Sequence, residues 1–341
     1  MKEISDFERF CSFDAMYDAS YKVCKNVRWK DSTIHFEEHR LETILDTQTR
    51  LTDDEYQQLI FSCFRIIERG KPRDIRACHI NDRLVQNALC ETVLLPVLTP
   101  KFIYDNCATL KGKGIDFALQ RFKTHLQRAN RDYKGKDFYG LRIDIRKYFD
   151  SIDHDSLKQL IAEVIKDPDV CRVTQYFVST FSYKLTKDGK PIPHKDYFIA
   201  SNGKYVPWQG TEFKPRGHYY EYEEKSLGLG SQTSQLFALL VLNKLDHYIK
   251  EQLHIKYYGR YMDDLYLLSN DIEHLKKCKT AIGIELGKLG LSFNPNKTVI
   301  TKIHPIHKDN KKGAPFKYLK WNFYITQSGH IIQLPFKKKL S

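Results

Sequence analysis

Two adjacent carboxylates between two runs of β-forming residues restrict the fold of this chain more than any other feature. Asp263 and Asp264 separate residues 255–261 from residues 265–268, so we expect them at the tip of a β-hairpin, here called the carboxylate hairpin. Like charges side by side at a tight turn repel each other, and a polyvalent cation would neutralise them. The pair therefore indicates a metal site, whereas a solvated turn is the simpler interpretation of these two residues alone.

The net charge of the chain points to a polyanionic partner. Its 341 residues include 55 Lys and Arg against 42 Asp and Glu, a net charge of +13 at pH 7. Nucleic acid is the first candidate and an anionic membrane surface the second. No apolar run approaches the ~20 residues that span a bilayer, and no secretory signal opens the chain. Without a spanning segment, we expect no membrane partner. The eight cysteines lack metal-binding spacing, so we expect reduced thiols and a cytoplasmic location.

The apolar periodicity predicts helices alternating with short strands. Asp153 is expected to cap one helix and Gly290 to end another. Residues 184–226 show no helical period, so we interpret them as an insertion with a hairpin at residues 196–206. The expected helices are 52–68, 115–129, 154–166, 233–253 and 273–289, and the expected strands are 139–145, 297–303 and 318–326.

A third carboxylate completes a pattern that suits phosphoryl chemistry. Asp144 lies near the end of the expected strand 139–145, and a small-residue turn at residues 228–235 precedes the carboxylate hairpin. Two strands placed side by side would bring Asp144 within reach of Asp263. The carboxylates would then hold two Mg²⁺ ions ~3.5–4 Å apart, one activating an attacking hydroxyl and one stabilising the leaving oxygen. The pattern therefore predicts nucleotidyl transfer.

At these positions the chain resembles the reverse transcriptases. Asp144 and Tyr261-Met262-Asp263-Asp264 match that family's catalytic strand and hairpin, and the resemblance covers about residues 12–326. It implies an RNA-directed DNA polymerase with an α+β, right-hand fingers-and-palm fold, in which a thumb is largely absent from this chain. The antiparallel palm sheet would be backed by the helices that start at His154 and Thr233. The implied cofactor is Mg²⁺, as two ions, with Mn²⁺ as an alternative.

The resemblance also implies roles for single residues. Lys297 resembles the lysine proposed to protonate the leaving pyrophosphate, and Phe149 matches the aromatic gate that excludes a 2′-hydroxyl and so selects deoxynucleotides. The residues expected at the metal ions are Asp144, Ile145, Asp263 and Asp264. Those expected at the nucleotide are Arg73, Lys111, Lys113, Phe149, Gly230, Ser234 and Gln235, and those expected in the primer grip are Tyr318, Leu319 and Trp321.

The likeness is strongest to prokaryotic retroelement enzymes, of the diversity-generating and group II intron-like branch. Ser234-Gln235 is typical of the diversity-generating enzymes, whereas Leu229 stands where many reverse transcriptases carry Gln. The implied partners are an RNA template, a DNA or RNA primer, deoxynucleotides and an accessory protein. The implied parts are an N-terminal extension with fingers (1–139), a palm (140–183 and 227–317) around the insertion (184–226), and a primer-grip hairpin with the start of a thumb (318–341).

Other functions stay open at this point. A defence-associated reverse transcriptase that makes untemplated or protein-primed DNA would use the same catalytic residues. A catalytically silent nucleic-acid-binding subunit is disfavoured because a dead site gains nothing by retaining clustered charges. An RNA-dependent RNA polymerase is disfavoured because Phe149 cannot accept a hydrogen bond from a ribose hydroxyl.

The gate hypothesis makes the first prediction. Phe149→Ala should raise ribonucleotide incorporation relative to deoxynucleotide incorporation by about 10- to 100-fold, because removing the ring opens space for the 2′-hydroxyl. Competition between the two nucleotides in primer extension measures this ratio. An unchanged ratio would contradict the gate.

Overall fold

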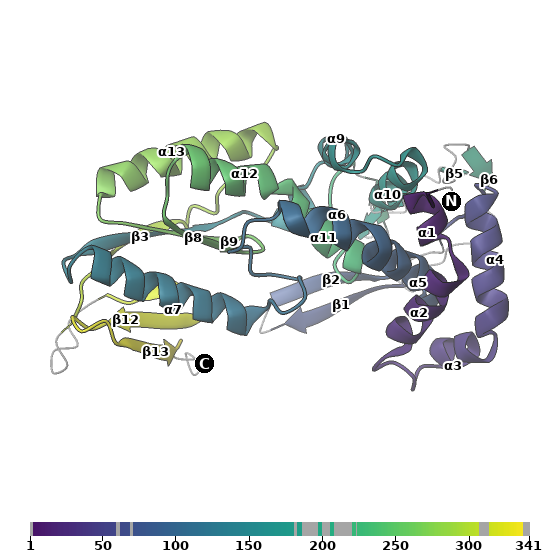
Figure 1. The fold of residues 1–341 in the computed structure, drawn as a ribbon, viewed down its shortest axis with the longest axis horizontal. Coiled ribbons are helices and arrows are strands. Elements are labelled where there is room, and N and C mark those ends of the chain that lie inside the picture. The colour runs from purple at the N-terminus through teal and green to yellow at the C-terminus, as the bar shows by residue number, and fades with distance from the viewer. Residues whose placement is uncertain are drawn as a thin grey trace. The chain divides into compact units, whose positions relative to one another are not determined.

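The computed structural model describes residues 3–58, 62–68, 71–180, 183–185, 197–199, 205–207, 220–222, 224–306 and 314–336. The chain divides into two compact units, whose elements are labelled in Figure 1. The first unit comprises Met1–Pro100 and Ile152–Ala238, and the second comprises Lys101–Ser151 and Leu239–Ser341. The five functional parts expected from the sequence remain a prediction.

The described part of the first unit is mainly helical. Asp153 caps α9 as expected, since its side chain accepts a hydrogen bond from the Ser156 backbone N–H at 2.9 Å. The helices are α1 (Asp6–Phe10), α2 (Phe13–Cys24), α3 (Asp31–Glu38), α4 (Arg40–Thr52), α5 (Ile80–Leu89), α6 (Leu95–Leu98), α9 (His154–Val164), α10 (Pro168–Thr180) and most of α11 (Gln232–Val241). The strands are β1 (Ser62–Glu68), β2 (Lys71–Ala77), β4 (Tyr183–Leu185), β5 (Tyr197–Ile199), β6 (Tyr205–Pro207) and β7 (Tyr220–Tyr222).

The helix expected over residues 52–68 is wrong. α4 ends at Thr52, and β1 pairs antiparallel with β2, so that Ile66 lies opposite Arg73. β-branched residues favour strands, but the hydrogen bonds that stabilise a strand come from its partner. That partner, β2, begins only three residues after β1 ends, just outside the range 52–68, so this range taken alone suggested a helix.

The insertion contains short paired strands. β5 pairs antiparallel with β6, which agrees with the hairpin expected at residues 196–206, and β4 pairs with β7. The rest of that hairpin, and the basic residues 337–339 at the end of the chain, lie outside the described residues.

The second unit is built on an antiparallel sheet in the order β10-β3-β9-β8. α13 packs on one face against β3 and β9, whereas α7 packs on the other face against β8 and β9 (Figure 1). A second sheet, β11-β12-β13, lies on the α7 side. The elements are α7 (Ile115–Asp132), β3 (Phe138–Asp144), α8 (Tyr148–Ser151), α12 (Asn243–His247), β8 (Tyr257–Tyr261), β9 (Asp264–Ser269), α13 (Ile272–Lys288), β10 (Val299–Ile303), β11 (Phe316–Tyr318), β12 (Trp321–Ile325) and β13 (Ile331–Pro335).

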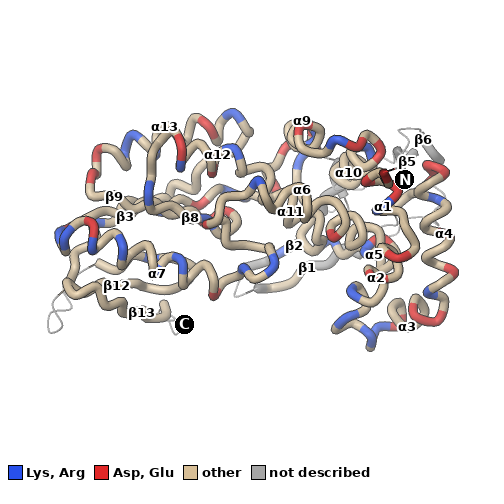
Figure 2. The backbone as a smooth tube through the Cα atoms, viewed as in Figure 1, with Lys and Arg blue, Asp and Glu red and all other residues tan. Residues whose placement is uncertain are grey.

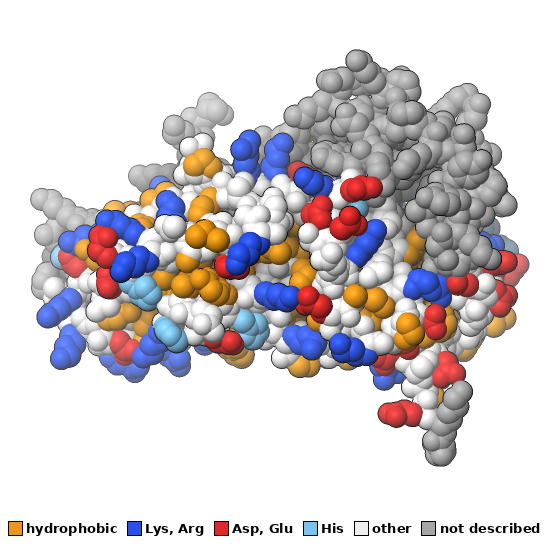
Figure 3. Space-filling model, turned by 90° about the horizontal axis from the view of Figure 1, so that it is seen from above, with side chains coloured by type: hydrophobic (Ala, Val, Ile, Leu, Met, Phe, Trp, Pro, Cys, Tyr) orange, Lys and Arg blue, Asp and Glu red, His pale blue; other side chains and the backbone are white. Residues whose placement is uncertain are grey.

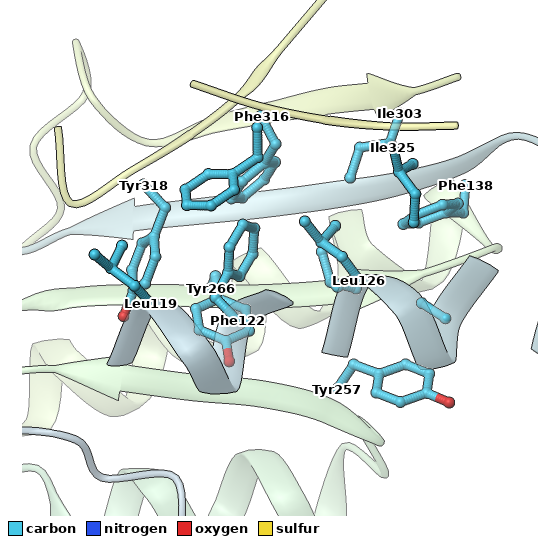
Figure 4. Packing of buried hydrophobic residues seen from close by; sticks show 13 residues of the cluster. Leu119, Phe122, Leu126, Phe138, Tyr257, Tyr266, Ile303, Phe316, Tyr318 and Ile325 are labelled. Atoms are coloured by element: carbon cyan, nitrogen blue, oxygen red, sulfur yellow. The ribbon is translucent and has the colours of Figure 1, made fainter. Parts of the chain in front are cut away.

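Aromatic rings fill the space between α7 and the two sheets (Figure 4). Phe122 of α7 is fully buried, and its ring centroid lies 4.7 Å from that of Tyr266 and 5.2 Å from that of Phe316. Such ring pairs add about 0.5–1.5 kcal/mol each beyond burial. Gly140 of β3 lies directly under the Phe316 ring, where a Cβ atom would collide with it. The close approach of the two sheets therefore requires glycine at this position.

Two expectations about the helices need correction. The helix α9, expected to back the palm sheet, lies in the first unit and packs against α10. An amphipathic pattern shows that a helix has a core face, but it does not show which surface that face meets. The helix expected over residues 233–253 is interrupted at Leu242 and continues as α12 and a π-helical turn at Tyr248–Gln252.

The C-terminal part of the second unit agrees better with the sequence. Gly290 has φ +68° directly after the last turn of α13, as expected for a residue that ends a helix. The expected strand 318–326 is instead the hairpin β11–β12, whose two-residue turn, Leu319 and Lys320, has φ values of +43° and +68°. Neither residue type usually marks such a turn, so local residue preferences did not indicate it, whereas the family resemblance implied a primer-grip hairpin that starts at Tyr318.

The described cysteines agree with the reduced thiols expected from the sequence. Seven described cysteines are free thiols, of which all but Cys171 are buried. Across the described ranges, no helix combines the length and apolar character needed to cross a bilayer.

Candidate active site

The three carboxylates come together at one end of the β3–β9 pair. Asp144, the last residue of β3, lies opposite Asp264, the first residue of β9. Asp263 occupies the turn between β8 and β9, and its backbone carbonyl accepts a hydrogen bond from the Ile145 N–H at 3.3 Å. The structure thus places Asp144 beside the carboxylate hairpin, as the sequence predicted.

Lys297 lies at the same end of the sheet. Its Nζ donates a hydrogen bond to Asp144 Oδ2 at 2.6 Å. The segment before it is held to the end of β3, because the Asn294 N–H donates to the Asp144 carbonyl at 2.7 Å and the Arg146 N–H to the Ser292 carbonyl at 2.9 Å. An ammonium group therefore balances one of the three carboxylates.

The pKa of Asp264 reflects both its burial and the charges around it. Burial, with a smaller contribution from Asp263 and Asp144, raises its pKa to about 7, although Arg142 and Lys297 act in the opposite direction. Its Oδ1 atom is buried and has no hydrogen-bond partner among the described residues. A carboxylate in this position needs added positive charge to remain ionised at neutral pH.

Arg142 connects the carboxylates to two neighbouring backbone segments. Its guanidinium donates to the Lys297 carbonyl at 3.2 Å and to the Lys317 carbonyl at 3.2 Å. The side chain lies on β3 two residues before Asp144, and its charge lowers the pKa of Asp264. Arg142 thus fixes the Lys297 segment and the β11–β12 hairpin while it stabilises a carboxylate.

A buried ion pair supports the back of the carboxylate hairpin. Arg260 on β8 and Asp246 on α12 are both fully buried, and Arg260 Nε donates to Asp246 Oδ1 at 2.8 Å. Burial alone would lower the pKa of Arg260, but Asp246 outweighs it and the net shift is upward, so the guanidinium stays charged. The same guanidinium donates to the Met262 carbonyl at 3.2 Å, at a residue with φ +53°. This contact stabilises a left-handed backbone that a large side chain rarely adopts.

The carboxylates fit a divalent cation by their chemistry. Aspartate oxygens are the ligands that Mg²⁺ prefers, and the unpaired Oδ1 of Asp264 and its raised pKa show where positive charge would be stabilising. Ile145 is buried and apolar, so only its backbone carbonyl could serve as a ligand. One group of three potential metal ligands in the described ranges lies outside the carboxylate site. It consists of the exposed residues His35, Glu38 and His39, whose ligand atoms lie within 4.8 Å of one another.

The chain matches a known protein family over most of its length. The model of the family described as reverse transcriptase (RNA-dependent DNA polymerase) matches residues 67–323, three quarters of the chain, including every residue of the carboxylate site. The chain belongs to the reverse transcriptase family. A comparison with curated proteins gave no match.

Solved structures show the same fold at low sequence identity. The apo telomerase from Candida tropicalis truncated from its C-terminal domain is 14% identical, with a TM-score of 0.53 over 87% of this chain and 60% of that chain. The apo telomerase from Candida tropicalis without that truncation is also 14% identical, with a TM-score of 0.50 over 87% of this chain and 53% of the other. This reverse transcriptase chain thus spans about 60% or less of the telomerase chains it matches, and the likeness extends to the fold alone.

Further residues assigned from the sequence lie in the same unit as the carboxylates. Phe149 is half-buried on α8, with its ring against that of Tyr148. Lys111 is exposed, whereas Lys113 donates to the Tyr104 carbonyl at 2.8 Å and so holds its own loop. In the expected primer grip, Tyr318 is buried and pairs across the turn with the half-buried Trp321, and Leu319 forms the turn. Their roles remain predictions.

Four residues assigned to the nucleotide belong to the first unit. Arg73 is exposed on β2, next to the strand segment that pairs with Leu229. Gly230 has φ +124°, which favours glycine, and Gln235 is exposed on α11. Ser234 is fully buried and its Oγ lies 2.7 Å from that of Ser231. The described contacts of Ser234 are those of a helix start, so its assignment to the nucleotide stays a prediction.

Three residues of the site were not predicted from the sequence: Arg142, Asp246 and Arg260. Two of them carried a signal, since each arginine interrupts an otherwise apolar or aromatic strand beside a catalytic candidate. A charged residue at such a position requires a buried partner or a functional role. Asp246 gave no comparable signal, because an acidic residue in a helix is usually exposed.

The buried ion pair makes a prediction about stability. Asp246→Asn should lower the free energy of unfolding by about 3–5 kcal/mol, because it leaves the Arg260 guanidinium buried without a counter-charge. Urea unfolding followed by circular dichroism measures the change. Glu273→Gln, which removes an exposed partner of Lys276, is the matched control and should cost less than about 1 kcal/mol. Equal effects of the two variants would contradict the structural role of Asp246.

Lys297 makes a prediction about kinetics. If its ammonium is a general acid, Lys297→Ala should slow single-turnover incorporation by about 10²–10⁴-fold with little change in nucleotide affinity. Lys297→Arg keeps the charge but donates a proton poorly, so it should be nearly as slow. A rate close to wild type for the arginine variant, or a defect in affinity alone, would instead assign Lys297 to charge balance or phosphate binding.

Proposed function

We propose that this chain is an RNA-directed DNA polymerase that adds deoxynucleotides to a primer 3′-hydroxyl by nucleotidyl transfer. The pairing of Asp144 with Asp264 supports this function most directly, since it gathers the three carboxylates and Lys297 at one end of the palm sheet. Family membership supports the same reaction.

Each residue of the site has a distinct task in this proposal. Asp144, Asp263 and the carbonyl of Ile145 would hold two Mg²⁺ ions, with Mn²⁺ as an alternative, and Asp264 is a supporting carboxylate. The bound ions supply Lewis-acid activation of the primer hydroxyl and charge stabilisation on the leaving oxygen. Lys297 moves from Asp144 to the departing pyrophosphate and donates a proton to it. Arg142 and Arg260 keep the carboxylates and the turn in place through their backbone contacts.

The remaining assigned residues select and place the substrates. Phe149 excludes the ribose 2′-hydroxyl, which makes deoxynucleotides the substrates. Arg73, Lys111, Lys113, Gly230, Ser234 and Gln235 contact the nucleotide, and Tyr318, Leu319 and Trp321 position the primer end. The net charge of +13 supports binding of an RNA template and of a DNA or RNA primer.

The proposed biological setting rests on a sequence motif. Ser234-Gln235 supports a prokaryotic retroelement enzyme that copies a retroelement RNA. We further propose a cytoplasmic location and an accessory protein that guides the RNA. Template dependence separates this role from that of a defence-associated enzyme that makes untemplated or protein-primed DNA.

Primer extension tests the proposed activity. With an RNA template, a DNA primer, Mg²⁺ and four deoxynucleotides, the chain should extend the primer, and Asp263→Ala with Asp264→Ala should reduce the rate by about 10³-fold, equivalent to about 4 kcal/mol of transition-state stabilisation. Asp271→Ala, which removes a carboxylate that caps α13, is the control and should retain activity.

Reactions that omit the template or the primer test the two alternative functions, the defence-associated enzyme and the silent binding subunit. DNA synthesis that continues without template or primer would favour the defence-associated function. Absence of extension with Mg²⁺ and with Mn²⁺, while the chain still binds the primer–template, would contradict polymerase activity and favour a silent binding subunit.

A further inference from the structure

A polar hollow of about 590 Å³ lies at the C-terminal end of α7. One wall is the last turn of α7 with the turn that follows it, and the other is the turn at residues 327–329 between β12 and β13. We call this the α7 hollow. Its lining includes Arg128, Arg131, Lys134 and Gln127, and none of the described residues that line it has a hydrophobic side chain. An apolar ligand would find no complementary surface here.

The positive charge of the hollow is poorly balanced. Arg128 and Arg131 are three residues apart on α7, so both project on the same side of the helix, and Lys134 follows. All three side chains are exposed, and within the described ranges neither Arg128 nor Lys134 has an ion-pair partner. Arg131 lies 3.6 Å from Asp132, but Lys256 and Tyr257 already contact that carboxylate. The basic segments at this end of α7 are visible in Figure 2.

The two walls are held together before any ligand binds. Asn130 is 4% exposed, and its Nδ2 donates to the Gln327 carbonyl at 3.3 Å, which ties α7 to the turn between β12 and β13. The Gly135 N–H donates to the Asn130 carbonyl at 2.8 Å and closes the end of the helix. Cations on a rigid frame lose less conformational entropy when they bind a ligand.

The α7 hollow is separate from the carboxylate site. It adjoins the start of β3, whereas Asp144 ends that strand. Six residue steps along a strand correspond to roughly 20 Å. A nucleic acid strand with one phosphate per ~3.4 Å of axis would need about six nucleotides to reach from one site to the other.

We propose that the α7 hollow binds the sugar–phosphate backbone of a nucleic acid strand, as a second contact site outside the active site. Guanidinium groups match phosphate oxygens in charge and in bidentate geometry, and the polar lining offers hydrogen bonds without selecting a base. The site would retain template or primer–template while the active site is open. This role builds on the proposed polymerase function, but binding at the hollow requires no catalysis.

The salt dependence of RNA binding tests the proposal. The probe is a fluorescent single-stranded RNA of 20 nucleotides, and its affinity is measured by anisotropy between 50 and 300 mM KCl without nucleotides or divalent ions. For Arg128→Gln, Arg131→Gln and Lys134→Gln combined, the slope of log affinity against log salt should become less steep by about 2, or about 0.7 for each lost phosphate contact.

A matched control removes equal charge elsewhere in the same unit. Lys276→Gln, Lys277→Gln and Lys279→Gln lie on α13, on the opposite side of the palm sheet, the face seen from above in Figure 3. This variant should leave the slope within about 0.5 of the wild type. Equal changes in both triple variants, or no change in the hollow variant, would overturn the proposal and leave only non-specific attraction. Thermal melts of both variants exclude unfolding as the cause.

A single exposed substitution provides an independent readout. Gln127→Glu places a carboxylate four residues before Arg131 and should weaken binding of the 20-nucleotide RNA several-fold, with a smaller effect on a 5-nucleotide RNA, which is too short to reach both sites. Binding of an acidic peptide as tightly as RNA would show that the hollow binds acidic protein segments and would overturn the proposal.

The outcome can be separated from that of the polymerase test. Unchanged RNA binding in the hollow variant beside active primer extension would refute only the hollow. A changed salt slope in a chain that does not extend a primer would refute only the polymerase.

Discussion

The fully buried ion pair between Arg260 and Asp246 is the interaction on which the carboxylate hairpin depends. Arg260 bonds Asp246 on α12 and the carbonyl of Met262, while its own backbone carbonyl accepts a hydrogen bond from the Cys107 N–H at 2.8 Å. One side chain thus joins a helix and a strained turn, and the backbone of the same residue holds a preceding loop. Burying two charges is costly unless the geometry and additional hydrogen bonds compensate, and here both are present.

The same balance of charge governs the front of the hairpin. Three carboxylates at one end of two strands would repel each other, and the structure offsets this with Lys297 on Asp144 and with Arg142 near Asp264. The ammonium and the guanidinium hold the site together while leaving Asp264 Oδ1 without a partner. A site that is stable but incompletely neutralised is well suited to bind cations and phosphates, because both supply what the fold leaves unsatisfied.

Much of the site could be predicted from the sequence because its signals are local. Asp263 and Asp264 stand between two β-forming runs, and Asp144 follows an alternating strand, so short-range patterns were sufficient to locate all three. Arg142 and Arg260 could have been flagged by their charge within strands. Asp246 could not, since its burial results from packing of α12 against residues far away in the sequence. The helix expected over residues 52–68 failed for a more local reason, because β1 is stabilised by its pairing with β2, which begins only three residues after β1 ends.

By itself, the sequence determined the residue types, the carboxylate hairpin, the strand that ends at Asp144, the amphipathic helices and the excess of positive charge. These depend on side-chain chemistry and on periodicity within a few residues. Only the tertiary structure decided that Asp144 lies opposite Asp264, that Arg260 is neutralised by Asp246, and that Arg128 and Arg131 line a hollow with the turn at residues 327–329. Pairing, burial and charge balance arise between distant segments, so they are settled only when the chain packs.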